Sequence, residues 1–146
     1  MNAKKILFPT DFSTLSDEAL AHAATLAKEG QGELVIVHVE EPPIAYGAGE
    51  MYYGVSEPDT KTLTKMLNDI KPEDPAVRVR RRLIVGNPAE EIVNLAEEEN
   101  VDLIVMSTHG RTGFKRFLMG SVAEAVVRNA KCPVLTLKPR VPAKAT

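Results

Sequence analysis

Glycine and hydroxyl residues gather in two short segments near the C-terminal end of the chain. The first is Ser107-Thr108-His109-Gly110-Arg111-Thr112-Gly113, and Gly120-Ser121 follows after six more residues. An apolar run precedes the first segment, and a helix-like run begins at Val122. Glycine lets the backbone approach a phosphate closely, and the first N–H groups of a helix point at such a ligand. The pattern therefore predicts an anion site of the kind that binds a nucleotide.

The elements that must position these segments alternate between strand and helix. Apolar runs predict strands at 6–8, 34–39, 77–85, 101–106 and 134–137. Helical spacing and capping residues predict helices at 16–28, from 59, from 88 and from 121 onward. This order predicts a single doubly wound α/β domain, with a parallel sheet and helices on both faces.

Ligands of such sheets bind at the carboxyl ends of the strands, where the winding reverses. Two polar loops are expected at that end: Pro9-Thr10-Asp11 after the first strand, and the segment from Ser107 to Ser121. We therefore expect both loops to face one pocket.

Composition excludes several other classes of protein. The net charge of −2 gives no general attraction to nucleic acid, and no apolar stretch approaches the about 18 residues of a membrane span. The single cysteine, Cys132, excludes an internal disulfide. We expect a cytoplasmic protein with one domain over residues 1–138 and a disordered tail over 139–146.

Residues for catalysis are not evident, and neither are the commonest phosphate-binding motifs. The chain has no P-loop and no dinucleotide-binding fingerprint after its first strand. Of the three histidines, His38 is expected to have a structural partner and His22 to lie at the surface. Only His109 falls in the candidate site, and no nucleophile is paired with it. We assign no catalytic residue and no metal ligand.

The chain resembles the universal stress protein (UspA-like) family from about Lys5 to Lys138. The motifs that carry the resemblance are Ile6-Leu7-Phe8-Pro9-Thr10-Asp11-Phe12-Ser13, Gly86-Asn87-Pro88, the segment 106–113, Gly120-Ser121-Val122-Ala123-Glu124-Ala125-Val126 and Cys132-Pro133-Val134. The resemblance implies a five-stranded parallel sheet of order 3-2-1-4-5, a homodimer and ATP as ligand, with Mg or Mn as a candidate cation.

ATP-binding members of that family carry Gly-x-x-Gly, nine residues and then Gly-Ser or Gly-Thr. Here Gly110, the nine residues 111–119 and Gly120-Ser121 match the later parts, but Ser107 replaces the first glycine. The β-carbon of serine could crowd a nucleotide, although its hydroxyl could also donate to phosphate.

The resemblance also implies a role for each matching residue. Asp11 would accept hydrogen bonds from the ribose hydroxyls. Pro9, Thr10, Val39 and Met106 would line the adenine and sugar pocket. Backbone N–H groups of Gly110, Gly120, Ser121 and Val122 would bind phosphate, with the Ser121 hydroxyl. Ser107, Arg111 and Gly113 would complete the phosphate loop, and Arg111 would supply positive charge.

Several of these residues also have a plain structural interpretation. Ser121 and Glu124 are spaced as a capping box, which would serve the helix without any ligand. Asp11 could cap the first helix or satisfy a turn. Gly110 and Gly113 could be turn residues alone. Four arginines, Arg78, Arg80, Arg81 and Arg82, are typical of the solvent face of an edge strand.

By resemblance, the last strand lies at the other edge of the sheet. Val134-Leu135-Thr136-Leu137 carries no charge, so pairing with the same strand of a second copy would cover an exposed edge. The leading hypothesis is thus an ATP-binding homodimeric sensor or regulator of a stress response. Two alternatives remain: an interaction module of the same fold that binds no nucleotide, and a very slow ATP hydrolase or phosphotransferase.

Overall fold

The computed structural model describes residues 3–42, 59–108 and 119–138, and these form one α/β sandwich. The elements in chain order are β1 (Lys5–Pro9), the short 3-10 helix η1 (Thr14–Ser16), α1 (Asp17–Glu29), β2 (Glu33–Glu40), α2 (Thr60–Asp69), β3 (Arg78–Val85), α3 (Pro88–Glu98), β4 (Leu103–Ser107), α4 (Ser121–Asn129) and β5 (Val134–Leu137). The five strands form one sheet of order β3-β2-β1-β4-β5, and every neighbouring pair is parallel. The predicted fold class and strand order are confirmed.

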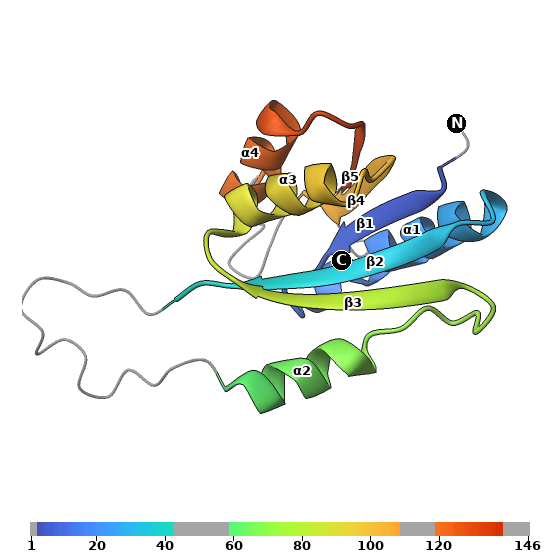
Figure 1. Ribbon diagram of the computed structural model, residues 1–146, viewed down its shortest axis with the longest axis horizontal. Helices are drawn as coiled ribbons and strands as arrows, with labels where there is room; N and C mark the ends of the chain where they lie inside the picture. Colours follow the sequence, from blue (N-terminus) through green and yellow to red (C-terminus); the bar gives the residue numbers. More distant parts are fainter. Residues whose placement is uncertain (1–2, 43–58, 109–118, 139–146) are drawn as a thin grey trace, which may run out of the picture.

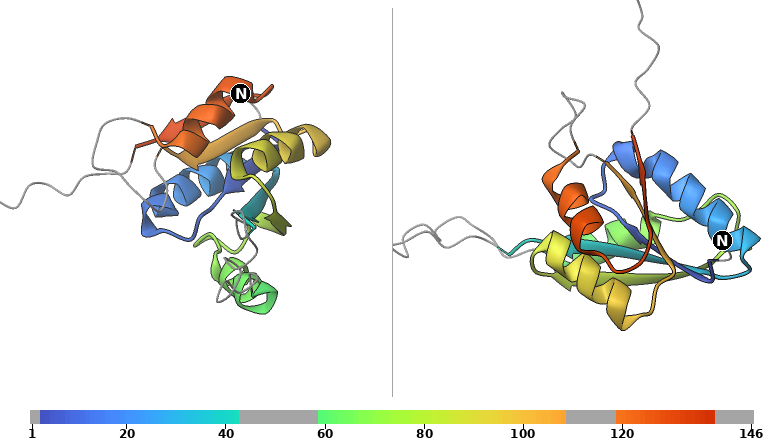
Figure 2. Two further views of the ribbon diagram at one scale, coloured as in Figure 1. Left: turned by 90° about the vertical axis from the view of Figure 1, so that its left-hand side faces the viewer. Right: turned by 90° about the horizontal axis from the view of Figure 1, so that it is seen from above.

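Helices cover both faces of this sheet, with α3 and α4 on one face and α1 and α2 on the other (Figures 1 and 2). Alternate residues of the central strands point to opposite faces. Ile6, Phe8, Leu34 and Ile36 pack toward α1 and α2, and Leu7, Val35, Val37 and Ile104 pack toward α3 and α4. Burial on both faces explains why these strands are continuous apolar runs.

In the described residues, the observed ends of the helices and strands lie within two residues of the ends predicted from the sequence. The predicted strand at 101–106 begins later, at Leu103, because the Val101 N–H donates to the Ala96 carbonyl and completes the end of α3. The helical spacing of Leu63, Met66, Leu67 and Ile70 predicts an apolar stripe on α2, which is only partly buried: Leu67 is buried, whereas Met66 is 39% exposed. The prolines and glycines of 40–57 predict an irregular loop, and most of that range lies outside the described residues, as does the predicted tail over 139–146.

Gly30 and Gly32 follow the first helix in the sequence and predict its end, but the structure needs them for a different reason. The left-handed residue of this turn is Gln31, with φ of 54°, not a glycine. A β-carbon on Gly30 would lie 2.2 Å from the Ala3 carbonyl oxygen, and one on Gly32 would lie 2.1 Å from the Lys4 carbonyl oxygen. The two glycines let the α1–β2 turn pass directly against the start of β1.

The arginines of β3 do more than face solvent, so that interpretation is wrong in part. The strand is at the sheet edge as expected, but Arg81 donates to the carbonyls of Leu67 and Ile70 at 3.1 and 2.7 Å, which holds the end of α2. On the other face, Arg80 contacts both Glu33 and Glu99, at 2.9 and 2.6 Å. Each arginine therefore ties the edge strand to a neighbouring element.

Glu99 is the centre of this ion-pair cluster, so we expect it to govern acid stability. Hydrogen bonding to Arg80 lowers the pKa of Glu99 from 4.5 to about 2. A carboxyl whose pKa is lowered by folding stabilises the fold above its unfolded pKa and loses that contribution as pH falls, here between about 4.5 and 2. We expect Glu99→Gln to lower the free energy of unfolding at pH 7 by about 2 kcal/mol.

Urea unfolding of the two proteins at pH 7, 4 and 3 measures this effect. Part of the difference between Glu99→Gln and the wild type should disappear as the pH falls to 3. The matched control is Glu98→Gln, because Glu98 is an exposed residue next in the chain. An equal difference at all three pH values would contradict the assignment.

Candidate functional site

A cavity of about 360 Å³ opens at the carboxyl ends of β1, β2 and β4, beside the start of α4. Every predicted site residue within the described part of the chain lines it: Pro9, Thr10, Asp11, Val39, Met106, Ser107, Gly120, Ser121 and Val122. The remaining three, Gly110, Arg111 and Gly113, lie outside the described residues. The structure thus brings the two predicted loops together at one cavity.

The turn after β1 is built by the side chains of Thr10 and Asp11. The Thr10 Oγ1 accepts a hydrogen bond from the Phe12 N–H at 3.0 Å, and Asp11 Oδ1 accepts one from the Ser13 N–H at 2.9 Å. Phe12 itself has φ of 70°, a conformation that residues with a side chain rarely adopt. Asp11 therefore does satisfy a turn, as its structural interpretation predicted, and the same side chain lines the cavity.

The start of α4 differs from the predicted capping box, which is wrong. The N-cap is Gly120, and its carbonyl accepts a hydrogen bond from the Glu124 N–H at 3.0 Å. Ser121 is then the first helical residue, and Glu124 is one position too late to reach the cap. Glu124 pairs with Arg128 instead, at 2.7 Å. The N-cap residue Gly120 has no side chain, so it gives the first N–H groups of the helix no side-chain acceptor.

The sequence pattern predicts that Val122, Ala125 and Val126 face inward from α4, and the buried face is narrower than that. Ala123 and Val126 are buried, whereas Val122 and Ala125 are only partly so. Val122 packs at the edge of the core and lines the cavity.

Hydrogen bonds fix the backbone on both sides of the segment 109–118. The Gly120 N–H donates to the Thr108 carbonyl at 2.7 Å, and the Thr108 N–H donates to the Leu137 carbonyl at 2.9 Å. The end of β4 and the start of α4 are therefore held together in the cavity wall. Ser107, the last residue of β4, is half-buried there.

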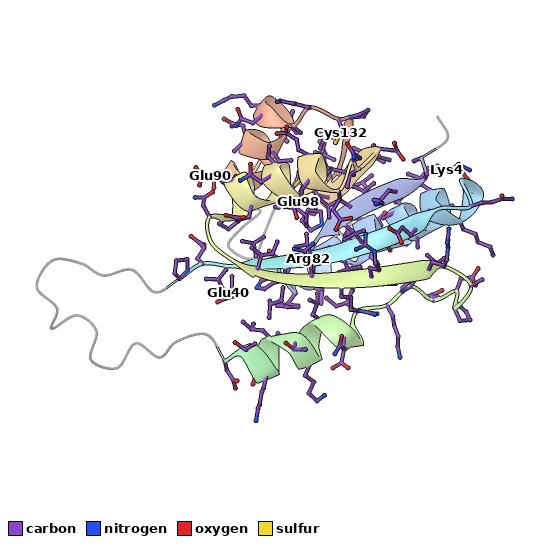
Figure 3. All side chains as sticks on the ribbon, in the orientation of Figure 1. Lys4, Glu40, Arg82, Glu90, Glu98 and Cys132 are labelled. Carbon is purple, nitrogen blue, oxygen red and sulfur yellow. The ribbon has the colours of Figure 1, made fainter. Side chains whose placement is uncertain are left out.

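Several cavity residues were not singled out from the sequence as site residues. They are Ser16, His38, Glu40, Glu41, Pro88, Ile92, Thr108 and Ala123. Figure 3 shows Glu40 at the carboxyl end of β2. The signal for His38 and Glu40 was present, because residues two apart in a strand share a face and these two end the strand beside the predicted pocket.

His38 has the structural partners that were expected of it. Its Nδ1 lies 2.8 Å from the Thr10 carbonyl oxygen and its Nε2 lies 2.7 Å from Glu40 Oε1. The ring is 2% exposed, and its centroid lies 4.2 Å from that of Phe12. The exposed position predicted for His22 is also found.

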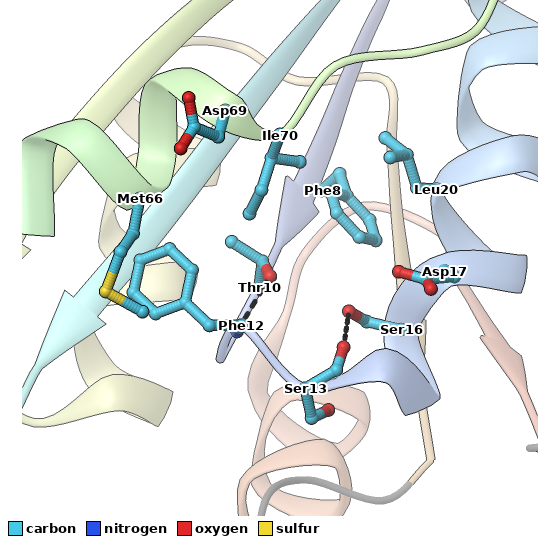
Figure 4. A pocket seen from close by; sticks show the side chains of 10 residues that line it. All are labelled: Phe8, Thr10, Phe12, Ser13, Ser16, Asp17, Leu20, Met66, Asp69 and Ile70. Atoms are coloured by element: carbon cyan, nitrogen blue, oxygen red, sulfur yellow. Dashed lines mark hydrogen bonds between the residues drawn. The ribbon is translucent and has the colours of Figure 1, made fainter.

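A second cavity, of about 250 Å³, lies on the face covered by α1 and α2 (Figure 4). Its walls are mainly apolar, with Phe8, Phe12, Leu20, Met66 and Ile70 around the turn that follows β1. Thr10 and Ser16 line both cavities. The turn is therefore the partition between them.

Neither a membrane-spanning helix nor a metal-binding cluster occurs in the part of the chain that the structure describes. None of the helices there is long and apolar enough to cross a membrane. Within the same residues, no three His, Cys, Asp or Glu side chains gather in a way that would hold a metal ion. Cys132 is half-buried, and desolvation raises the pKa of its thiol.

The sheet order and the cavity at the strand ends define a doubly wound α/β domain with a cleft at its switch point. The chain belongs to the Universal stress protein family, whose profile matches residues 2–138. Universal stress protein MJ0531 of Methanocaldococcus jannaschii is 41% identical over 139 residues, which cover 92% of this chain and 82% of that protein.

Solved structures of the family share the fold. The structure of MJ0577, a universal stress protein of the same organism, superposes with a TM-score of 0.77 at 35% identity and covers 97% of this chain and 99% of that one. A universal stress protein solved in complex with cAMP superposes with a TM-score of 0.70 at 26% identity, over 96% of this chain and 100% of that one.

Proposed function

We propose that this protein binds an adenine nucleotide, ATP, in the cavity at the carboxyl ends of β1, β2 and β4. The observation that carries the proposal is the start of α4, whose N-cap is a glycine without a side-chain acceptor and which lies in the wall of the same cavity as Asp11. Helix starts of this kind bind phosphate. The related structure with cAMP supports an adenine nucleotide as the class of ligand.

Each part of the nucleotide has a suitable partner in this arrangement. The N–H groups of Ser121 and Val122 would bind phosphate, with the Ser121 hydroxyl beside them. Asp11 would accept hydrogen bonds from the ribose through Oδ2, because within the described residues the Ser13 N–H uses only Oδ1. Val39 and Met106 supply apolar walls for adenine. A Mg or Mn ion would arrive bound to the phosphates.

We further propose that the protein acts in the cytoplasm as a sensor or regulator in a stress response. In this role the protein acts by binding: the nucleotide-bound and nucleotide-free forms are its two signalling states. Membership of the Universal stress protein family supports it.

The same proposal includes a homodimer through β5. This strand is the last of the sheet, and its Leu135 side chain is 37% exposed. Val127 of α4 is 47% exposed. An uncharged edge strand with exposed apolar side chains favours pairing with a second copy.

The dimer has a direct test in small-angle scattering over a range of protein concentrations. We expect the mass of two chains, and Leu135→Lys should shift the population toward single chains because it places a charge on the paired edge. A monomer mass at every concentration would overturn this part of the proposal.

Asp11→Ala is expected to weaken ATP binding by roughly 10- to 100-fold, because a hydrogen bond to a charged group contributes about 1.5–3 kcal/mol. Calorimetric titration with Mg-ATP measures the affinity. Asp17→Ala is the matched control, since Asp17 is an exposed carboxylate that does not line this cavity.

Asp11→Ala also removes the acceptor of the Ser13 N–H hydrogen bond in the turn, which is a separate effect on stability. Asp11→Asn keeps an acceptor for the Ser13 N–H, so its melting temperature should stay close to that of the wild type. Equal ATP affinity in the wild type and Asp11→Ala, or no heat of binding in either, would contradict the proposed function.

A further inference from the structure

The two ring nitrogens of His38 both face groups that accept hydrogen bonds. Nδ1 is 2.8 Å from the carbonyl oxygen of Thr10, and Nε2 is 2.7 Å from Glu40 Oε1. A carbonyl oxygen never donates, so Nδ1 must carry a proton. A neutral ring then has a bare lone pair at Nε2, which would face the oxygen of an ionised carboxylate at hydrogen-bond distance.

Two lone pairs at 2.7 Å repel each other, so the contact requires a proton between Nε2 and Oε1. This conclusion is the same whether the proton is assigned to the ring or to the carboxyl group. Burial of the ring, which is 2% exposed, removes the water that would otherwise separate the two groups. Together, His38 and Glu40 therefore carry no net charge while they hold this proton.

The position of the pair in the cavity makes this proton relevant to ligand binding. Among the described residues that line the cavity there is no lysine or arginine, whereas Asp11, Glu40 and Glu41 all line it. His38 is thus the only basic side chain in that set. Loss of its proton would leave the Glu40 carboxylate uncompensated in a wall that is already acidic.

We propose that His38 is a positioning residue of the nucleotide site, which holds Glu40 through a shared proton and keeps its negative charge off an anionic ligand. The inference rests on the proposed function for its effect on binding. It assigns the site a proton-linked affinity: an anionic adenine nucleotide binds better while the pair holds the proton.

Other charged groups on the elements packed around the ring do not replace this contact. Arg81 of β3 is engaged by the carbonyls of Leu67 and Ile70, and Asp11 by the Ser13 N–H. Glu41, which lines the same cavity, and Asp17 and Asp69, which line the second cavity, are all exposed.

The Glu40→Gln variant keeps the contact with His38 Nε2 but removes the need for an added proton. Its amide N–H can donate to a neutral Nε2, so the contact persists with no added proton and no charge. While its ring is neutral, the variant pair has the same net charge of zero as the wild-type pair has when it holds its proton.

Nuclear magnetic resonance of the ring nitrogens tests the pair itself, without any ligand. At pH 6 to 7 we expect wild-type His38 to show a proton at Nδ1 and a second one shared by Nε2, and Glu40→Gln to show a neutral ring with Nε2 as acceptor. His22→Gln, which removes an exposed histidine, should leave these signals unchanged. An unprotonated Nε2 in the wild type at pH 6 would overturn the proposal.

Binding of cyclic AMP tests the effect on the site, because its phosphodiester keeps one negative charge across the range used. As the pH is raised stepwise from 6, we expect wild-type affinity to fall roughly three- to fivefold once the pair has lost its proton, as one added charge several ångströms away would cause. Affinity in Glu40→Gln should stay level at the low-pH value of the wild type. Neutral adenosine should show a smaller change.

The outcomes distinguish this proposal from the proposed function. Identical pH profiles for the wild type and Glu40→Gln would overturn the link between the proton and binding. Absence of cyclic AMP, adenosine and ATP binding at every pH would overturn the proposed function, while the nitrogen signals would still decide the state of the His38–Glu40 pair.

Discussion

Gly120→Ser is expected to weaken ATP binding at least tenfold without loss of stability. Gly120 has φ of −65° and ψ of 160°, which any residue adopts, so the backbone conformation does not require glycine. Serine is a good N-cap, and its hydroxyl accepts a hydrogen bond from the second or third N–H of the helix. Those N–H groups are the ones proposed to bind phosphate, so the cap and the ligand would compete.

Calorimetry with Mg-ATP and thermal unfolding without ligand together measure both effects. Gly120→Ala is the matched variant, because it adds a β-carbon but no acceptor and should weaken binding less than serine does. Unchanged ATP affinity in Gly120→Ser would show that phosphate does not use this helix start.

Gly32→Ala is expected to give the largest loss of stability. Its β-carbon would lie 2.1 Å from the Lys4 carbonyl oxygen and 2.6 Å from the Lys4 Cα, both backbone atoms, so the turn or β1 must move. Overpacking of this kind lowers the free energy of unfolding by about 3 kcal/mol. For a domain of this size the melting temperature should fall by about 6–12 °C.

Gly86→Ala is the control, since a β-carbon there would meet the Glu91 side chain, which can rotate away. We expect Gly86→Ala to lower the free energy of unfolding by less than about 1 kcal/mol, because the Glu91 side chain can move out of contact. Equal melting temperatures for Gly32→Ala and the wild type would contradict the tight passage of the α1–β2 turn against β1.

The fold was predictable because its signals are local and repeated. The apolar runs of β1, β2 and β4 are continuous, and Asn87 with Pro88 marks the start of α3, where the Asn87 side chain does accept the Glu90 N–H at 3.0 Å. The strand order came from family resemblance. Alternation alone gives a parallel sheet without saying which strand lies at the edge.

The site was predictable in its backbone parts and less so in its side chains. Strand ends converge in any parallel sheet, so Asp11 and Ser121 were expected at one cavity, and the structure places both there. Three details depend on atomic geometry that no spacing encodes. They are the N-cap at Gly120 rather than Ser121, the double role of the β3 arginines, and the contact between His38 Nδ1 and the Thr10 carbonyl.

We expect an adenine nucleotide to occupy the cavity between the β1 turn and the start of α4. Titration of the labelled protein with Mg-ATP, followed by the chemical shifts of its backbone amides, locates the bound nucleotide. We expect saturable shifts at Asp11, Val39 and the first residues of α4, with little change at the second cavity, near Leu20 and Ile70. Shifts confined to the second cavity, or no shifts at millimolar ATP, would contradict the claim.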